Sequence, residues 1–163
     1  QHLIDQGHTK IGFLAGDSQH MSTVERYKGY KKALEINGLE FDPQRVIEGS
    51  YAFEFGVAGT KELMAREEAP SAIFSCNDEI AAGSLYAARL MNKKIPEELA
   101  IVGFENSPFS RQTWPQMTTA DQPNKEIAEN AAKLLISLIR QQESNHIVCQ
   151  YVPQLVIRNS TAS

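Results

Sequence analysis

Two apolar stretches of this chain, AIFSC at 72–76 and LAIVGF at 99–104, each run directly into a polar pair. Asn77-Asp78 follows the first stretch, and Glu105-Asn106 follows the second. Short runs that are apolar on both faces are typical of strands in a parallel sheet, because helices cover both faces of such a sheet. Ligands of open parallel sheets bind at the carboxyl ends of the strands. The two polar pairs therefore predict a binding site for a small polar molecule at that edge.

The rest of the chain predicts strands that alternate with helices. Strands or extended segments are expected at 11–14, 45–48, 72–76, 99–104, 118–121 and 147–157. Apolar residues at helical spacing predict helices at 24–36, 53–66 and 127–140, and a stretch rich in small residues predicts another at 78–90. Ser22 or Thr23 would cap the first of these helices. The alternation indicates right-handed βαβ units, so the predicted fold class is α/β, a doubly wound parallel sheet with helices on both faces.

Composition narrows the classes of protein to which the chain can belong. Its 163 residues, of which 42% are hydrophobic, fit one compact domain or one lobe of a larger one. A net charge of −4 argues against a dedicated nucleic-acid-binding domain. No stretch is apolar enough to predict a membrane span. The chain opens with QHLIDQGH, which resembles the middle of a helix, so we expect further sequence before it.

The two cysteines, Cys76 and Cys149, bear on the compartment in which the protein folds. Cys76 lies in a predicted buried strand, which favours a free thiol in a reducing compartment. A disulfide between the two residues stays open as the alternative.

The motifs of common enzyme classes are absent from the sequence. There is no G-x-S-x-G nucleophile motif, no Walker A loop and no G-x-G-x-x-G, since the turn after the first strand reads AGDSQH at 15–20. The four histidines are scattered, and no residues have the spacing of a metal site. We therefore expect no catalytic residues, no cofactor and no metal. A flavodoxin-like enzyme remains a third interpretation, although no set of residues indicates a reaction.

Four polar or aromatic residues near the predicted strand ends, Arg26, Tyr51, Asn77 and Glu105, suit a sugar. Carboxylate and amide oxygens accept hydroxyl hydrogens, arginine donates in a planar fork, and an aromatic ring covers the C–H face of a pyranose. Each residue also has a purely structural interpretation. Asn77 or Asp78 can be a helix cap, Arg26 a solvated helix residue, Tyr51 a core residue and Glu105 plain surface.

Seven segments, taken together and in this order, resemble the C-terminal half of a LacI/GalR-family bacterial transcription repressor. They are HLIDQGHTKIGFLAG (2–16), ERYKGYKKALEINGL (25–39), EGSYAFEFG (48–56), PSAIFSCNDEIAAGSL (70–85), IPEELAIVGFENSP (95–108), WPQMTTADQP (114–123) and PQLVIRNST (153–161). Each segment alone is a weak signal, whereas their common order and spacing are specific. The resemblance covers nearly the whole chain and implies the C-terminal lobe of a type I periplasmic-binding-protein-like fold.

The resemblance also implies a domain organisation. Family members carry an N-terminal helix-turn-helix, a hinge and a two-lobed effector domain. Residues 1–122 would form the C-terminal lobe, 123–142 a helix that crosses to an N-terminal lobe outside this chain, and 143–163 the return strand and tail. The apolar stripe of the helix at 127–140 would then lack its packing partner, and we expect another chain to cover it or some other shielding.

By the same resemblance, seven positions are expected to bind the effector. Arg26 matches an arginine in R-x-x-G, Asn77 belongs to the N-D pair, and Glu105 stands where most members have aspartate. The extra methylene of Glu105 would push its carboxylate deeper into the cleft. The whole expected ligand-binding set is Ser22, Arg26, Tyr51, Asn77, Glu105, Asn106 and Gln122.

The expected function is that of the effector-binding and dimerisation part of a cytoplasmic transcriptional regulator. A carbohydrate effector would bind between the lobes and shift operator affinity by favouring an open or a closed state. Operator DNA would be bound through an N-terminal helix-turn-helix, not by this chain, and a homodimer is expected because operators are palindromic. The alternative is a periplasmic sugar-binding protein of an ABC transporter, which upstream sequence would distinguish.

Overall fold

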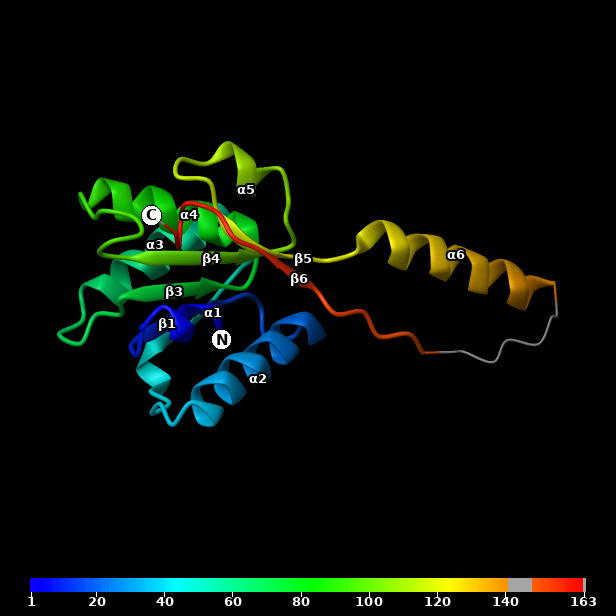
Figure 1. The fold of residues 1–163 in the computed structure, drawn as a ribbon, viewed down its shortest axis with the longest axis horizontal. Helices are drawn as coiled ribbons and strands as arrows, with labels where there is room; N and C mark the ends of the chain where they lie inside the picture. The colour runs from blue at the N-terminus through cyan, green and yellow to red at the C-terminus, as the bar shows by residue number, and fades with distance from the viewer. Residues whose placement is uncertain (141–147, 163) are drawn as a thin grey trace.

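The structure, a computed structural model, describes residues 1–140 and 148–162, which form a six-stranded sheet with helices on both faces (Figure 1). The strand order is β2-β1-β3-β4-β5-β6. The strands are β1 (Ile11–Ala15), β2 (Val46–Glu48), β3 (Ala72–Ser75), β4 (Ala100–Phe104), β5 (Thr118–Asp121) and β6 (Gln154–Val156). The predicted α/β fold with helices on both faces is therefore confirmed.

The sixth strand differs from the prediction. β1 to β5 pair in parallel, but β6 runs antiparallel to β5, with Thr119 opposite Val156. The chain leaves the sheet at the carboxyl end of β5 and returns to the same edge, so β6 must enter from that edge and run the opposite way (Figure 1). Within the described residues, the extended segment expected at 147–157 contributes only Gln154–Val156 as a strand, and residue 147 lies outside them.

The helices largely follow the apolar periodicity. They are α1 (His2–Asp5), α2 (Met21–Ile36), α3 (Phe53–Met64), α4 (Asp78–Leu90), α5 (Phe109–Gln112) and α6 (Asn124–Ile139), with a short 3-10 turn η1 (Pro43–Arg45). The short α5 was not expected from the sequence. The predicted cap of α2 is wrong, because His20 is the N-cap and its side chain makes no capping hydrogen bond. The Ser22 and Thr23 hydroxyls bond to Tyr51 instead.

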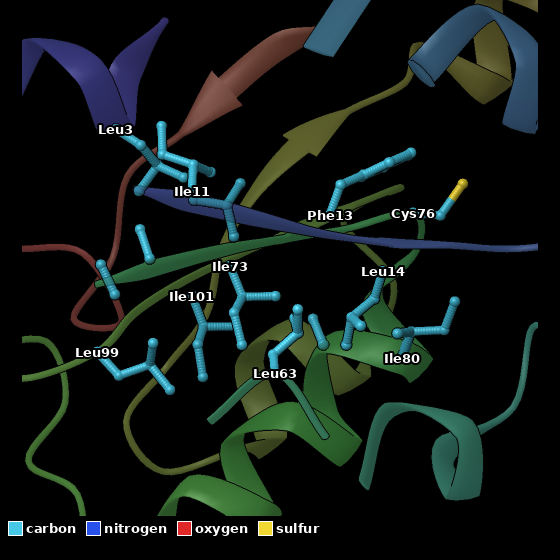
Figure 2. Close-up of a cluster of buried hydrophobic side chains, with 14 of the residues drawn as sticks. Leu3, Ile11, Phe13, Leu14, Leu63, Ile73, Cys76, Ile80, Leu99 and Ile101 are labelled. Atoms are coloured by element: carbon cyan, nitrogen blue, oxygen red, sulfur yellow. The ribbon is translucent and has the colours of Figure 1, made fainter. Parts of the chain in front are cut away.

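The core has two parts, one on each face of the sheet. Figure 2 shows Leu3, Ile11, Phe13 and Cys76 on one side of the strands, and on the other side Leu14, Leu63, Ile73, Ile80, Leu99 and Ile101. On the first face, the Phe13 ring stacks on the rings of Tyr27, Tyr30 and Phe74, which ties α2 to β1 and β3. Cys76 is buried and free, as its strand position predicted, and Cys149 is also free.

Two glycines bring α3 and α4 into direct backbone contact. A Cβ at Gly56 would collide with the Ile80 carbonyl group, and one at Gly83 would collide with the Phe53 carbonyl oxygen. The helices can therefore approach only because neither position carries a side chain. This contact fixes the first turn of α4, which begins at Asp78, the second residue of the polar pair after β3.

The helix α6 stands away from the sheet and is joined to it through β5 and β6 (Figure 1). None of its residues is buried, and Leu135, Leu138 and Ile139 are each more than half exposed. A hydrogen bond of 2.8 Å from Asn130 Nδ2 to Tyr151 Oη links it to the returning chain. Among the described residues, no helix is long and apolar enough to cross a membrane.

Candidate functional site

Arg26 lies at the polar edge, where residues at the ends of two strands, β3 and β4, hold its guanidinium. The sequence places Arg26 in the second turn of α2, on the face that packs on the sheet. The guanidinium carbon lies 4.0 Å from the centroid of the Phe104 ring at the end of β4. Nη1 donates a hydrogen bond of 2.6 Å to the Cys76 carbonyl at the end of β3. Stacking and hydrogen bonding together leave the other N–H donors of the fork for a ligand.

Glu105 faces this guanidinium from the loop after β4. Its Oε1 lies 3.9 Å from Arg26 Nη1, and its side chain is 39% exposed. Burial raises the pKa of Glu105, which the positive charge of Arg26 opposes and the negative charges of Asp78 and Glu79 reinforce. The wide Arg26–Glu105 separation leaves both groups able to bond to a third partner. A ligand hydroxyl that donates to Glu105 and accepts from Arg26 fits this pair.

Tyr51 is held firmly near Arg26, since both side chains contact the Cys76 thiol. Its hydroxyl hydrogen-bonds to Thr23 Oγ1 and, at 3.1 Å, to Ser22 Oγ. The ring covers Gly16, where a Cβ would lie 2.7 Å from Tyr51 Cε1. The His20 ring meets it edge-on, with the centroids 5.5 Å apart. The tyrosine is thus a fixed ring that can cover one side of a ligand.

Asn77 is the N-cap of α4, which settles one of its two interpretations. Its Oδ1 accepts a hydrogen bond of 2.9 Å from the Ile80 amide, and the residue is buried. The capping bond occupies the amide oxygen, so the NH₂ group is what Asn77 can offer to a ligand. It follows Cys76, whose carbonyl bonds to Arg26, and therefore lies beside the guanidinium.

Asn106 and Gln122 differ from the other expected ligand-binding residues in what surrounds them. Asn106 Oδ1 accepts hydrogen bonds from Arg158 Nη2 at 2.8 Å and from Ser110 Oγ at 3.2 Å, so its oxygen serves the loop. Gln122 follows β5 and shares with Ser22 and Arg26 the lining of a groove of about 700 Å³ on the α2 face of the sheet. Apolar side chains of α1, α2 and the sheet make up most of that groove.

The structure therefore brings Ser22, Arg26, Tyr51 and Glu105 together and places Asn77 next to them. Sequence reasoning missed Thr23, Cys76 and Phe104, which hold Tyr51 and Arg26 in place. Phe104 and Cys76 end the two apolar strands, so their positions were a usable signal. Among residues 1–140 and 148–162, no three histidine, cysteine, aspartate or glutamate side chains are placed to hold a metal ion. The arrangement suits hydrogen bonding to a small polar molecule.

Comparison with known proteins identifies the fold family. The sequence profile of the periplasmic binding protein-like domain matches residues 1–161. The chain is 34% identical over 163 residues to the HTH-type transcriptional repressor PurR of Pasteurella multocida (strain Pm70), and the match covers all of this chain. This chain is a periplasmic-binding-protein-like domain of the LacI/GalR type. The ribose operon repressor of Haemophilus influenzae (strain ATCC 51907 / DSM 11121 / KW20 / Rd) is 32% identical over 161 residues, 99% of this chain and 48% of that protein.

Solved structures agree with this assignment. A complex of the transcriptional regulator CelR with cellobiose has a TM-score of 0.93 at 30% identity, covering 98% of this chain and 49% of that one. The transcription regulator CcpA of Lactococcus lactis has a TM-score of 0.90 at 31% identity, covering 98% of this chain and 58% of that one. These relatives of the LacI/GalR-type domain are regulators rather than enzymes. The chain spans about half the length of the curated relatives it matches.

Proposed function

We propose that this LacI/GalR-type domain binds the effector of a DNA-binding transcriptional regulator and that the effector is a hydroxyl-rich small molecule, in the first place a sugar. The observation that carries the proposal is the Arg26 guanidinium. It is stacked on Phe104, bonded to the Cys76 carbonyl and 3.9 Å from the Glu105 carboxylate. A donor fork and an acceptor held this far apart fit a ligand group that both accepts and donates hydrogen bonds, as sugar hydroxyls do.

Three further observations support a sugar. The Tyr51 ring is fixed beside the polar groups, and aromatic faces suit the C–H side of a pyranose. Asn77 offers its NH₂ group to a ligand oxygen, because its own oxygen caps α4. A structure of similar fold, CelR, is described as a complex with cellobiose. The named relatives are transcriptional repressors or regulators, which favours a regulator over a transport protein.

The proposal includes an organisation for the whole protein. Residues 1–122 and the return segment 143–163 form one lobe, and the helix within 123–142 crosses to a second lobe. The exposed Leu135, Leu138 and Ile139 of α6 support this, because apolar side chains on a helix this far from the sheet need a cover. The protein acts as a homodimer in the cytoplasm, and a segment outside this chain binds operator DNA. The effector shifts DNA affinity through its unequal affinity for the two lobe arrangements.

The test uses the full-length protein and measures thermal stability and heat of binding with a panel of sugars that includes ribose and cellobiose, and with a panel of nucleobases. A bound effector raises the apparent stability by mass action. Replacing Glu105 with glutamine or Arg26 with lysine is expected to weaken binding by at least tenfold, about 1.4 kcal/mol, the loss typical of one charge-assisted hydrogen bond.

Glu62→Gln is the matched control, because Glu62 is exposed on α3, pairs with Arg66 and is remote from Arg26. Binding by Glu62→Gln should equal that of the wild type. If Glu105→Gln and Arg26→Lys bind a sugar as well as the control does, the site is wrong. If only nucleobases bind, and Glu105→Gln and Arg26→Lys weaken that binding, the site assignment is correct and the proposal of a sugar is wrong.

A further inference from the structure

The turn that carries Glu105 has an uncommon backbone. Glu105 and Asn106 have φ values of +109° and +52°, in the left-handed region that favours glycine. A non-glycine residue in such a conformation costs about 1–3 kcal/mol and persists only where surrounding groups hold it. The structure must therefore contain the groups that hold this turn.

Three consecutive amides of the turn donate to three different acceptors. The Glu105 amide bonds to the Ala120 carbonyl at 2.8 Å. The Asn106 amide bonds to Thr119 Oγ1 at 3.2 Å, and the Ser107 amide bonds to Asp78 Oδ2 at 2.7 Å. The first acceptor is ordinary strand backbone, whereas the other two are side chains that the sequence must supply.

Those two side chains are themselves joined. Thr119 Oγ1 donates a hydrogen bond of 2.5 Å to Asp78 Oδ1, and both residues are fully buried. A Cβ at Gly103 would collide with Asp78 Oδ1 and lie 2.7 Å from Met117 Sδ, so the carboxylate occupies space that only a glycine leaves. One oxygen of Asp78 thus accepts from the turn after β4 and the other from Thr119 in β5, although Asp78 belongs to the first turn of α4 after β3.

From this geometry we propose that Asp78 is a positioning residue for Glu105. Its buried carboxylate, acting through Thr119 Oγ1 and the Ser107 amide, holds the left-handed turn that directs Glu105 toward Arg26. The ligand does not touch Asp78. This role rests on the proposed function and joins the two polar pairs at the strand ends in one arrangement. Asn77 and Glu105 face the ligand, and Asp78 holds the turn of Glu105 in position relative to Asn77.

The test removes the Thr119 hydroxyl and follows Glu105 by NMR in the protein without ligand. Thr119→Val leaves no charge changed, unlike Asp78→Asn, which removes a charge that itself raises the pKa of Glu105. If the turn relaxes, Glu105 moves into solvent and its raised pKa falls toward the ordinary value. Thr119→Ser keeps the hydroxyl and should restore the wild-type titration. The Asn106 amide should exchange faster with solvent in Thr119→Val only.

Thr60→Val is the matched control, because Thr60 is also fully buried and its hydroxyl has no hydrogen-bond partner within the described residues. It should leave the Glu105 titration unchanged. The proposal is overturned if Thr119→Val titrates Glu105 as the wild type does, or if Thr60→Val shifts it equally. If Thr119→Val does not fold, Asp78→Asn takes its place, and NMR follows the contact between the side-chain protons of Glu105 and Arg26. The proposal then requires that Asp78→Asn lose this contact. These readouts need no effector, so a failed effector screen leaves the inference intact.

Discussion

The sharpest prediction concerns the contact between α3 and α4, which places Asn77 and Asp78. In Gly83→Ala the new Cβ would meet the Phe53 carbonyl oxygen well inside van der Waals contact and lie 2.9 Å from the Val57 nitrogen. These are backbone atoms, so no side chain can turn away, and the helices must separate. Overpacking of this kind costs about 3 kcal/mol. Replacing a helical glycine with alanine returns about 1 kcal/mol of helix propensity, so the net loss is about 2 kcal/mol.

Gly29→Ala is the same change in the middle of α2, and its Cβ would have no neighbour within 4 Å. It should stabilise the protein by about 1 kcal/mol. Urea unfolding followed by circular dichroism measures both variants, with an unchanged m-value as the check on two-state behaviour. For a chain of this size, Gly83→Ala should lower Tm by about 4–8 °C and Gly29→Ala should raise it by about 2–4 °C. Equal or same-sign shifts would refute the steric reasoning.

Two further predictions concern Tyr30 and Gly16. Tyr30→Phe leaves the Ile11 carbonyl without its 2.7 Å hydrogen bond and should cost about 1–2 kcal/mol in urea unfolding. Burial raises the pKa of Tyr30 from 10.0 to about 12. Its contribution to the free energy of unfolding is therefore complete below pH 10 and is lost as the pH rises toward 12. Tyr30→Phe should not show this loss of stability at alkaline pH. In Gly16→Ala the Cβ would lie 2.5 Å from Tyr51 Cε2, so the ring must move, and calorimetry on the full-length protein should show about tenfold weaker effector binding. Binding as tight as in the wild type would mean that Tyr51 does not contact the effector.

Local sequence patterns were sufficient for much of the fold. Apolar runs predicted β3 and β4, and apolar residues at helical spacing predicted α2 and α3, because burial follows directly from periodicity. The cap of α2 could not be predicted from its local sequence. The hydroxyls of Ser22 and Thr23 each hydrogen-bond instead to Tyr51, which lies 28 residues or more away along the chain. The reversal of β6 depends on where α6 returns the chain, which no local signal reports.

The candidate site divides in the same way. Strand ends and helix starts placed Arg26, Asn77 and Glu105 at one edge of the sheet, since parallel strands deliver their carboxyl ends together. Their roles were open in the sequence: Asn77 could have been either a cap or a ligand group, and it caps α4 while leaving its NH₂ group available. Asn106 was expected to contact the effector, yet Arg158, 52 residues away, occupies its oxygen.

By itself, then, the sequence determined a parallel α/β sheet with a polar carboxyl edge and a resemblance to one family of regulators. Only the tertiary structure decided that the acid of one polar pair is buried and the acid of the other lies at the candidate site. Asp78 and Glu105 are both acids directly beyond an apolar strand, but Asp78 is buried against Thr119 and Ser107, whereas Glu105 is held in the left-handed turn beside Arg26. The physical reason is that hydrogen bonds between residues about 30–40 positions apart, not local preference, set the direction of these side chains.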